Sequence, residues 1–365
     1  MSAVAARRDE RRWTALALPD RLAAAMRRAG AAGAIVGVWA DGARQTAAIG
    51  PADWESHEPL RPDTRLPVAS LTKPMLATAA VRAWQQRGIP LDTPLVELLP
   101  ELAEDWRASR RLSLRHLLSH TSGLRPAIPP VELARYGFAA DALEQAVRAT
   151  VRSGQIRPLG SCWRYSNPGY ALAGYALGVV AGNGLRAALR DHLLDPAGMS
   201  QTSFQGAQAS GHLDHWPVRG VYSIANRPAG GMISTVDDLL RFAEFVVGDG
   251  SLPAMAHTVA ASTFGAPYGL GWVGAHRWRV CWHLGDWGGC HAMLALVPDR
   301  RVAVAVLAND DGGTALRDPL VWGELTRLTG LRPPGNLTKM LYTGRCLSRG
   351  GLAAIAAAVR PRGRS

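Results

Sequence analysis

Four apolar segments near the end of the chain place the strongest constraint on its fold. Apolar side chains occupy nearly every position in them, rather than every second position, which predicts strands that are buried on both faces. Such a sheet needs helices on each side, and residues 319–329 form one candidate helix. The four segments are residues 268–274, 279–285, 290–297 and 302–308, and Pro298-Asp299-Arg300 joins the last two.

The beginning of the chain predicts further parts of the same sheet and its cover. Residues 9–29 carry apolar side chains at helical spacing with arginines on the other face, as in a helix that packs on a sheet. Residues 35–40 and 44–50 flank Asp41-Gly42, a dipeptide that supplies the positive φ angles of a tight hairpin turn. Residues 1–87 and 225–331 are therefore expected to form one α/β lobe.

The middle of the chain has a different pattern. Residues 88–224 contain several helical patterns, many Pro and Gly interruptions and almost no alternating strand, which predicts a mostly helical lobe. Residues 332–365 are rich in Pro, Gly and Arg and are interpreted as an appended basic tail. The expected fold class is α/β, with an antiparallel sheet flanked by helices and an inserted helical lobe.

The net charge of +12 would attract anionic surfaces. The arginines are nevertheless spread along the chain rather than gathered on one recognition helix, which argues against nucleic-acid binding. No run approaches the roughly 20 apolar residues of a membrane span, and the apolar run at residues 15–18 is too short for a signal peptide. A cytoplasmic protein is expected, and its oligomeric state stays open.

Cysteine and histidine spacing gives no strong metal signal. The four cysteines show no C-x-x-C spacing. Cys281, His283, Cys290 and His291 lie on two predicted strands, where ordinary alternation of side chains explains them better than a zinc site does. We therefore expect neither a metal nor a cofactor.

A Ser-x-x-Lys motif stands at the start of a predicted helix. Pro74 is tolerated in the first turn, and residues three apart share a helical face, so the Lys73 amine can reach the Ser70 hydroxyl. The chain has 41 basic residues but only two lysines, Lys73 and Lys339. Unlike arginine, a desolvated lysine can lose its proton and act as a base. About one chain in ten of this composition would contain the motif by chance, so the motif alone is weak evidence for a catalytic site. Further catalytic residues elsewhere in the chain are needed to support it.

A second motif, Tyr165-x-Asn167, precedes another predicted helix. Asn167 fits the N-cap and Pro168 fits the first helical position, which leaves Tyr165 on the loop just outside. A cap of this kind would present a phenol and an amide rigidly to a cleft. An earlier Ser119-His120 pair is better explained as a helix end closed by a Ser/Thr-Gly turn than as a second nucleophile.

Together with His283-Leu284-Gly285 on a late strand, these motifs resemble those of the penicillin-recognising serine hydrolases. The tyrosine and the histidine make the chain more similar to class C β-lactamases and their esterase and peptidase relatives. The resemblance covers residues 13–330. Three further stretches support it, namely Pro62-Asp63-Thr64, residues 117–124 and residues 229–232.

The resemblance implies that Ser70 is the nucleophile and becomes acylated, while Lys73 and Tyr165 share the proton transfers. An ammonium favours a neighbouring phenolate, whereas desolvation favours neutral lysine, so the two groups titrate as a pair. The sequence does not assign the proton between them. Asn167 is implied to position Lys73 or a substrate amide.

The third motif is implied to complete a substrate site. By family analogy, the oxyanion hole comes from the backbone N–H groups of Ser70 and Asp286, the residue after Gly285. His283 is expected at the edge of the cleft as a hydrogen-bond donor.

One departure from the family pattern affects the expected substrate. β-Lactamases and peptidases usually carry Lys-Thr-Gly or Lys-Ser-Gly at the third motif, where the cation and the hydroxyl bind a carboxylate. His283-Leu284 lacks both the permanent charge and the hydroxyl. The alternative to carboxylate recognition is an apolar substrate pocket lined by tryptophans near this strand. Core packing is a competing explanation for some of these tryptophans, which are Trp272, Trp278, Trp282 and Trp287.

The expected function is that of a serine hydrolase that forms an acyl-enzyme on Ser70 from a small-molecule ester or amide, with esterase-type hydrolysis first. Three alternatives stay open. They are β-lactamase or D-alanyl-D-alanine carboxypeptidase activity, acyl transfer in small-molecule biosynthesis, and ligand binding without catalysis.

Overall fold

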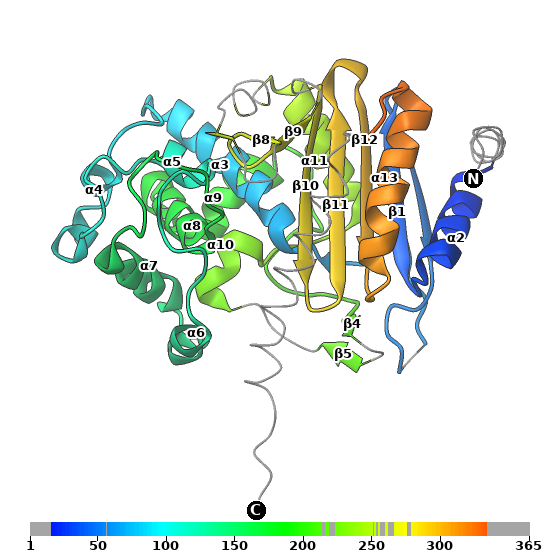
Figure 1. Cartoon of the computed structure of the whole chain (residues 1–365), viewed down its shortest axis with the longest axis horizontal. Coiled ribbons are helices and arrows are strands. Elements are labelled where there is room, and N and C mark those ends of the chain that lie inside the picture. Colours follow the sequence, from blue (N-terminus) through cyan, green and yellow to red (C-terminus); the bar gives the residue numbers. More distant parts are fainter. Residues whose placement is uncertain are drawn as a thin grey trace, which may run out of the picture.

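The structure is a computed structural model that describes residues 16–55, 57–213, 216–218, 223–250, 252, 255, 260–261, 266–275 and 279–333. A long sheet lies on one side of the molecule and a group of helices on the other (Figure 1). The start of the predicted helix at 9–29, Lys339, Trp278 and nearly all of the predicted tail lie outside the described residues.

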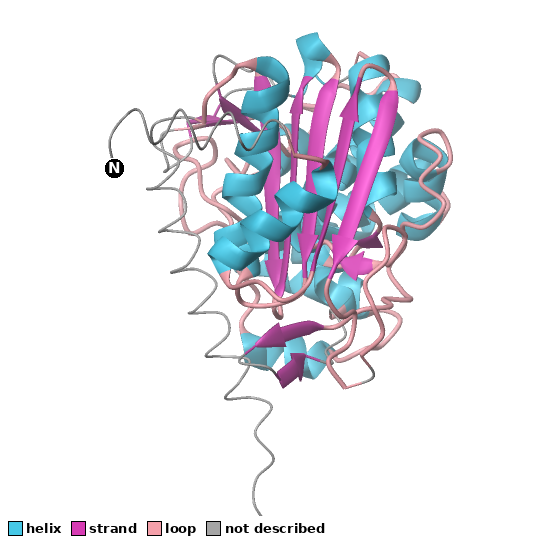
Figure 2. Cartoon of the chain, turned by 90° about the vertical axis from the view of Figure 1, so that its right-hand side faces the viewer, coloured by secondary structure: helices cyan, strands magenta, loops and turns pink. Residues whose placement is uncertain are grey.

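Eight strands of the described residues form one sheet in the order β2-β1-β12-β11-β10-β9-β8-β7, and all neighbours in it are antiparallel (Figure 2). The predicted hairpin is confirmed, with φ angles of 51° at Asp41 and 77° at Gly42. The strands are β1 (Ala34–Ala40), β2 (Ala43–Ile49), β7 (Ala260–Ala261), β8 (Pro267–Tyr268), β9 (Val273–Ala275), β10 (Val280–Trp287), β11 (Cys290–Val297) and β12 (Val302–Ala308).

Two of the sequence predictions need correction. The segment 268–274 is not one strand, because Gly271 has a φ of 83° and a tight turn separates β8 from β9. The helix predicted at 319–329 begins earlier, as α13 (Gly313–Thr329), with Pro319 inside it. Proline removes one helical hydrogen bond, but the buried face of α13, which includes Leu316 and Leu320, packs on the sheet and outweighs that loss.

Both faces of the sheet are covered, as the apolar density predicted. On one face, α2 (Leu18–Ala29) and α13 pack Leu22 and Leu320 against strand residues such as Val306. On the other face lies α11 (Val236–Gly248), which approaches β1 closely at Gly37. A Cβ atom added to Gly37 would lie 2.1 Å from a methyl group of Val236, so only glycine fits there. The core therefore has two layers, one on each side of the sheet.

The helices between the hairpin and α11 form the other side of the molecule (Figure 1). Helix α3 (Thr72–Gln86) is buried along most of its length and contacts both α8 and α10. The remaining helices are α4 (Leu95–Leu98), α5 (Leu114–Leu118), α6 (Pro130–Tyr136), α7 (Ala142–Ser153), α8 (Asn167–Ala181), α9 (Gly184–Leu189) and α10 (Arg227–Gly230).

Short elements connect these helices and strands. Two pairs of short strands lie outside the main sheet, and β4 and β5 fall in the segment predicted as mostly helical. The short strands are β3 (Leu66–Pro67), β4 (Gly211–Leu213), β5 (Trp216–Val218) and β6 (Ile233–Ser234). The short helices are η1 (Ala69–Leu71), η2 (Pro100–Asp105), η3 (Arg190–Leu194), η4 (Ile224–Asn226) and η5 (Pro298–Arg300).

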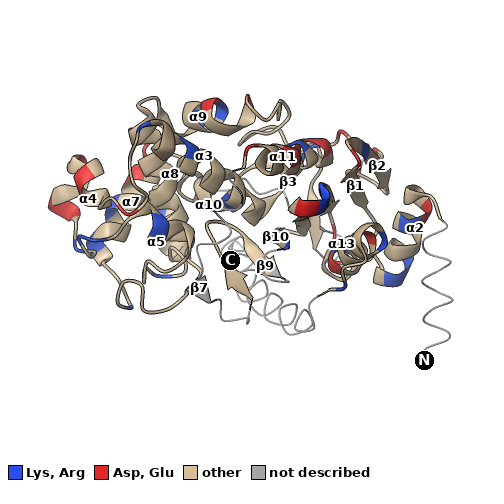
Figure 3. Cartoon of the chain, turned by 90° about the horizontal axis from the view of Figure 1, so that it is seen from above, with Lys and Arg blue, Asp and Glu red and all other residues tan. Residues whose placement is uncertain are grey.

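Charged residues are distributed over many elements. Figure 3 shows basic and acidic positions interspersed along the ribbon on helices of both sides of the molecule. In the described part of the chain, no single helix has the length and apolar composition needed to cross a membrane, and only the bent pair 167–181 and 184–194 meets that test jointly.

Candidate active site

Ser70 lies in η1, on a sharp turn between β3 and α3. Ala69 has a φ of 45°, a left-handed conformation that is strained for a residue with a side chain and that clusters at functional sites. Thr72 holds this turn, because its hydroxyl donates to the Ala69 carbonyl at 2.7 Å and accepts from the Met232 N–H at 3.0 Å. The turn places Ser70, half-buried, at the start of α3 as the sequence predicted.

Three polar side chains meet at Ser70. The Ser70 Oγ lies 2.8 Å from the Tyr165 hydroxyl, and the Lys73 Nζ donates to the same Oγ at 3.1 Å. Lys73 also donates to the carbonyl of Ala229 in α10, and its Nζ stands 4.6 Å from the centre of the Tyr165 ring. The structure therefore brings the Lys73 amine and the Tyr165 phenol within hydrogen-bonding distance of the Ser70 hydroxyl.

The environment of Lys73 favours its neutral form. Its side chain is fully buried, and no acidic group in the described residues pairs with it. Burial places the pKa of Lys73 well below its usual value, because a desolvated ammonium has lost its hydration without gaining a counter-charge. A neutral amine next to a serine hydroxyl can accept that hydroxyl's proton.

The cap of α8 differs from the prediction. Ser166, not Asn167, is the N-cap, since its extended backbone lets Oγ accept from the Gly169 N–H at 3.0 Å. Asn167 is instead the first helical residue, and its backbone N–H donates to the Pro126 carbonyl at 2.9 Å. The buried Oδ1 of Asn167 has no hydrogen-bond partner among the described residues. The Asn167 side-chain oxygen is thus not used by the cap.

Sequence reasoning did not find the part that His120 plays. The turn after α5 is confirmed, but His120 has a φ of 60° and is fully buried beside Tyr165, with their ring centroids 4.4 Å apart. Its carbonyl accepts from the Arg164 N–H at 2.7 Å, and its Nδ1 accepts from the Ser166 N–H at 3.1 Å. His120 therefore holds the backbone on both sides of Tyr165. The only signal in the sequence was the stretch 117–124, which contributed to the family resemblance.

Strand β10 passes close to the Ser70 turn at Gly285. A Cβ atom added to Gly285 would lie 2.1 Å from the Val68 carbonyl oxygen and 3.2 Å from the Ser70 nitrogen. Only glycine allows this approach. The backbone around Gly285 and Asp286 is therefore adjacent to the Ser70 amide, as a two-donor oxyanion hole would need.

His283 is arranged differently from the predicted donor at the cleft edge. It is only 5% exposed, and its two ring nitrogens lie 2.7 Å from the Leu284 carbonyl and 3.2 Å from the Tyr268 hydroxyl. Burial, with the nearby Lys73 as a smaller cause, lowers the pKa of His283 to about 3. The imidazole is therefore neutral, donates from Nδ1 to the carbonyl and accepts from Tyr268. It supplies no positive charge to the site.

The neighbouring tryptophans divide between core and site. Trp272 is buried and stacks on Phe242, and Trp282 is buried against Trp322, so core packing explains both. Leu284 also packs into the core between the sheet and α13. The half-buried Trp287, at the end of β10, is the one described member of the predicted tryptophan set that stays a candidate for the substrate pocket.

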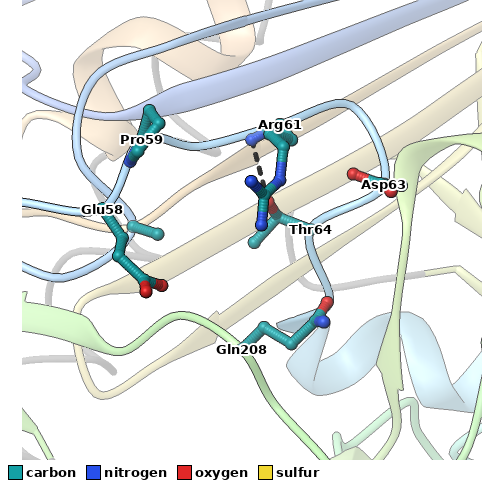
Figure 4. Close-up of a pocket in the computed structure, with 7 residues that line it drawn as sticks. Glu58, Pro59, Arg61, Asp63, Thr64 and Gln208 are labelled. Carbon is teal, nitrogen blue, oxygen red and sulfur yellow. Dashed lines mark hydrogen bonds between the residues drawn. The ribbon is translucent and has the colours of Figure 1, made fainter.

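A separate cavity of about 280 Å³ lies elsewhere on the surface (Figure 4). It contains no residue of the Ser70 cluster and no lysine, histidine or cysteine. Its lining consists of Ala52, Glu58, Pro59, Arg61, Asp63, Thr64 and Gln208. Among the described residues, no group of three or more His, Cys, Asp or Glu side chains is arranged to hold a metal ion. The arrangement best suited to chemistry is therefore the cluster at Ser70.

Comparison with known families agrees with this geometry. The beta-lactamase family model matches residues 18–324, which include Ser70, Lys73, Tyr165 and β10. The chain belongs to the beta-lactamase family. Enzymes of this family are serine hydrolases. The family assignment confirms the resemblance inferred from the motifs.

Individual relatives of this beta-lactamase family member differ in their named activities. Penicillin-binding protein 4 of Amycolatopsis lactamdurans is 26% identical over 337 residues, covering 83% of this chain and 87% of that protein. Esterase EstB of Burkholderia gladioli is 32% identical over 178 residues, covering 44% of each chain. A solved class C beta-lactamase superimposes with a TM-score of 0.74 at 21% identity, over 86% of this chain and 96% of that one, and confirms the predicted fold.

Proposed function

We propose that the protein is a hydrolase that forms an acyl-enzyme on Ser70 from a neutral ester. The observation that carries the proposal is the contact of Ser70 Oγ with both Lys73, at 3.1 Å, and Tyr165, at 2.8 Å. A hydroxyl in water is a poor nucleophile, and an adjacent base that removes its proton during attack activates it.

The first half-reaction transfers the acyl group to the enzyme. The Ser70 proton passes to the Lys73–Tyr165 pair as Oγ attacks the carbonyl carbon of the ester. The backbone N–H groups of Ser70 and Asp286 hold the negative charge that develops on the carbonyl oxygen. The tetrahedral intermediate then expels the alcohol, whose oxygen takes the proton from the pair.

The second half-reaction releases the acid. A water molecule gives a proton to the same pair and attacks the acyl carbon, and Ser70 Oγ recovers a proton when it leaves. An acceptor alcohol or amine in place of water would give acyl transfer by the same steps. Asn167 lies two residues from Tyr165, so its free Oδ1 is suited to orient the acyl group or the acceptor.

The preference for a neutral ester rests on the third motif. His283 is neutral and buried, and Leu284 packs on the α13 side of the sheet, so neither supplies a cation or a hydroxyl for a substrate carboxylate. The similarity to esterase EstB supports the same preference over part of the chain. The similarity to penicillin-binding protein 4 covers more of the chain and keeps β-lactam or peptide substrates as the second candidate.

Intact-mass spectrometry tests the proposal. The protein is incubated separately with a series of nitrophenyl esters, a penicillin and a D-Ala-D-Ala peptide. We expect an acyl adduct with the esters that is absent in Ser70→Ala, and faster turnover of esters than of the other two classes. An adduct that persists in Ser70→Ala would refute the nucleophile, and turnover of penicillin or peptide alone would refute the preference for neutral esters.

A further inference from the structure

A cluster of charges lies behind the end of β10, in which Arg317 and Asp318 are buried and the Asp286 side chain is 29% exposed. Arg317 of α13 is 2% exposed and donates at 2.7 Å to the carboxylates of both Asp286 and Asp318. The same Nη1 that contacts Asp286 also lies 3.3 Å from the carbonyl oxygens of Gly285 and Ala292. Arg317 thus connects α13 to the backbone of the β10 and β11 strands at the level of Ser70.

We propose that Arg317 is a positioning residue that orients and polarises the peptide group between Gly285 and Asp286, so that its N–H becomes an effective oxyanion donor. This inference rests on the proposed acylation of Ser70. It assigns to α13 a part in catalysis, although Arg317 itself touches no reacting atom.

The orientation of this peptide group follows from its contacts. Gly285 and Ala292 are paired across β10 and β11, and one guanidinium nitrogen reaches both of their carbonyl oxygens. The Gly285 carbonyl therefore points to the β11 side of β10. In a trans peptide the N–H points opposite to the carbonyl, so the Asp286 N–H points away from β11. This is the edge that β9 leaves uncovered, because β9 pairs only with residues 280–282.

Polarisation acts through the same peptide group. A hydrogen bond from a cation to the carbonyl oxygen draws electron density away from the amide nitrogen, which makes its N–H a stronger donor. The donor is then already strong and correctly aimed before charge develops on the substrate oxygen. Preorganisation of this kind is the basis of oxyanion stabilisation.

Arg317 also offsets a negative charge that would otherwise oppose the reaction. The Asp286 carboxylate belongs to the residue that supplies the proposed N–H. Burial alone would raise its pKa, but the charge of Arg317 and hydrogen bonds from His291 and Arg317 lower the pKa to about 2. The carboxylate is therefore ionised beside a developing oxyanion, and an unpaired anion at this position would weaken the oxyanion hole.

The same helix offers a matched control. Glu324 of α13 forms a buried ion pair with Arg21 of α2, at 2.5 and 3.0 Å, with side-chain exposures of 6% for Arg21 and 0% for Glu324. This pair ties α13 to α2, and its other hydrogen bonds within the described residues go to Leu16 and Arg327 rather than to β10. Replacing either arginine by lysine keeps the positive charge but loses the planar guanidinium, whose several N–H groups donate to more than one acceptor at once. The two variants therefore impose a similar structural change, and only Arg317→Lys affects strand β10, which supplies the proposed oxyanion donor.

The test compares Arg317→Lys with Arg21→Lys and the wild type. We expect Arg317→Lys to lower kcat for a nitrophenyl ester by about 10- to 100-fold with KM within about twofold, somewhat less than complete removal of an oxyanion-hole donor. The inhibition constant of phenylboronic acid, whose tetrahedral adduct with Ser70 places an oxygen in the oxyanion hole, should rise by a similar factor. Arg21→Lys should change neither value more than about twofold.

Several results would overturn the inference. A folded Arg317→Lys with wild-type kcat, or a loss equal to that of Arg21→Lys, refutes the positioning role. If Arg317→Lys does not fold, Arg317→Gln decides, because its amide keeps a donor for a carbonyl oxygen and loses the charge. It should lower kcat at least as much as expected for Arg317→Lys, and wild-type kcat would refute the positioning role. Failure of the wild type to form a Ser70 adduct would refute the proposed function separately.

Discussion

Replacing Lys73 by methionine should reveal the protonation state of Lys73 through the pH dependence of stability. Methionine has a similar length and no ionisable group, so it preserves the packing around a side chain that is fully buried. In the unfolded wild type Lys73 has an ordinary pKa near 10.4, whereas burial in the folded protein places its pKa well below that value. Folding therefore requires Lys73 to release a proton over the interval between these two values.

The sign and size follow from linkage. Between the lowered and the ordinary pKa, the unfolded wild type binds one more proton than the folded protein at this site, so the unfolding free energy rises with pH. The slope is about 1.4 kcal/mol for each pH unit. Lys73→Met lacks this contribution. Relative to the wild type, the stability of Lys73→Met should therefore fall by about 1.4 kcal/mol for each pH unit between pH 7 and pH 9 over which Lys73 is neutral in the folded protein.

Urea unfolding followed by tryptophan fluorescence measures this difference at pH 7, 8 and 9. Ser70→Ala is the matched control, because it removes the reactive hydroxyl but keeps Lys73 and should show the wild-type slope. Both variants should lose ester hydrolysis, by at least about 10²-fold for Lys73→Met. A difference between Lys73→Met and wild type that does not change with pH would show that Lys73 stays protonated in the fold, and the argument for a neutral base would fail.

Three further predictions concern Tyr165 and the residues that hold its loop. Tyr165→Phe keeps the ring beside Lys73 but removes the hydroxyl, so kcat should fall about 10²- to 10⁴-fold with an unchanged circular dichroism spectrum, and near-normal kcat would remove the phenol from the mechanism. Ser166→Ala should cost about 1 kcal/mol of unfolding free energy through the lost cap, whereas Asn167→Ala should cost less and mainly raise KM; the reverse order of stabilities would contradict the observed cap. His120→Phe leaves the Ser166 N–H without its acceptor and should cost about 1–3 kcal/mol with a lower kcat, and an unaffected kcat would show that His120 does not position Tyr165.

Features set by neighbours in sequence could be predicted from the chain alone. The hairpin at Asp41-Gly42 depends on backbone angles that few residue types adopt, and the Ser70–Lys73 pair depends on the spacing of one helical turn. The strands β11 and β12 follow from continuous apolar runs that must be buried. The prediction of Asn167 as the cap of α8 was wrong, because Ser166 satisfies the same residue preference and only the backbone angles separate the two positions.

Other features depended on residues far apart in the chain, and only the tertiary structure decided them. Tyr165 reaches Ser70 because His120 holds the loop on both sides of it, and no local pattern encodes that contact. The low pKa of Lys73 comes from packing that removes water, which a Ser-x-x-Lys motif does not specify. The contact of Arg317 with Gly285 likewise joins a helix and a strand that are adjacent only after folding. The sequence by itself determined which reactive groups are present and which of them share a helical turn, whereas the fold decided their protonation, their aim and their partners, because burial and long-range contacts set these properties.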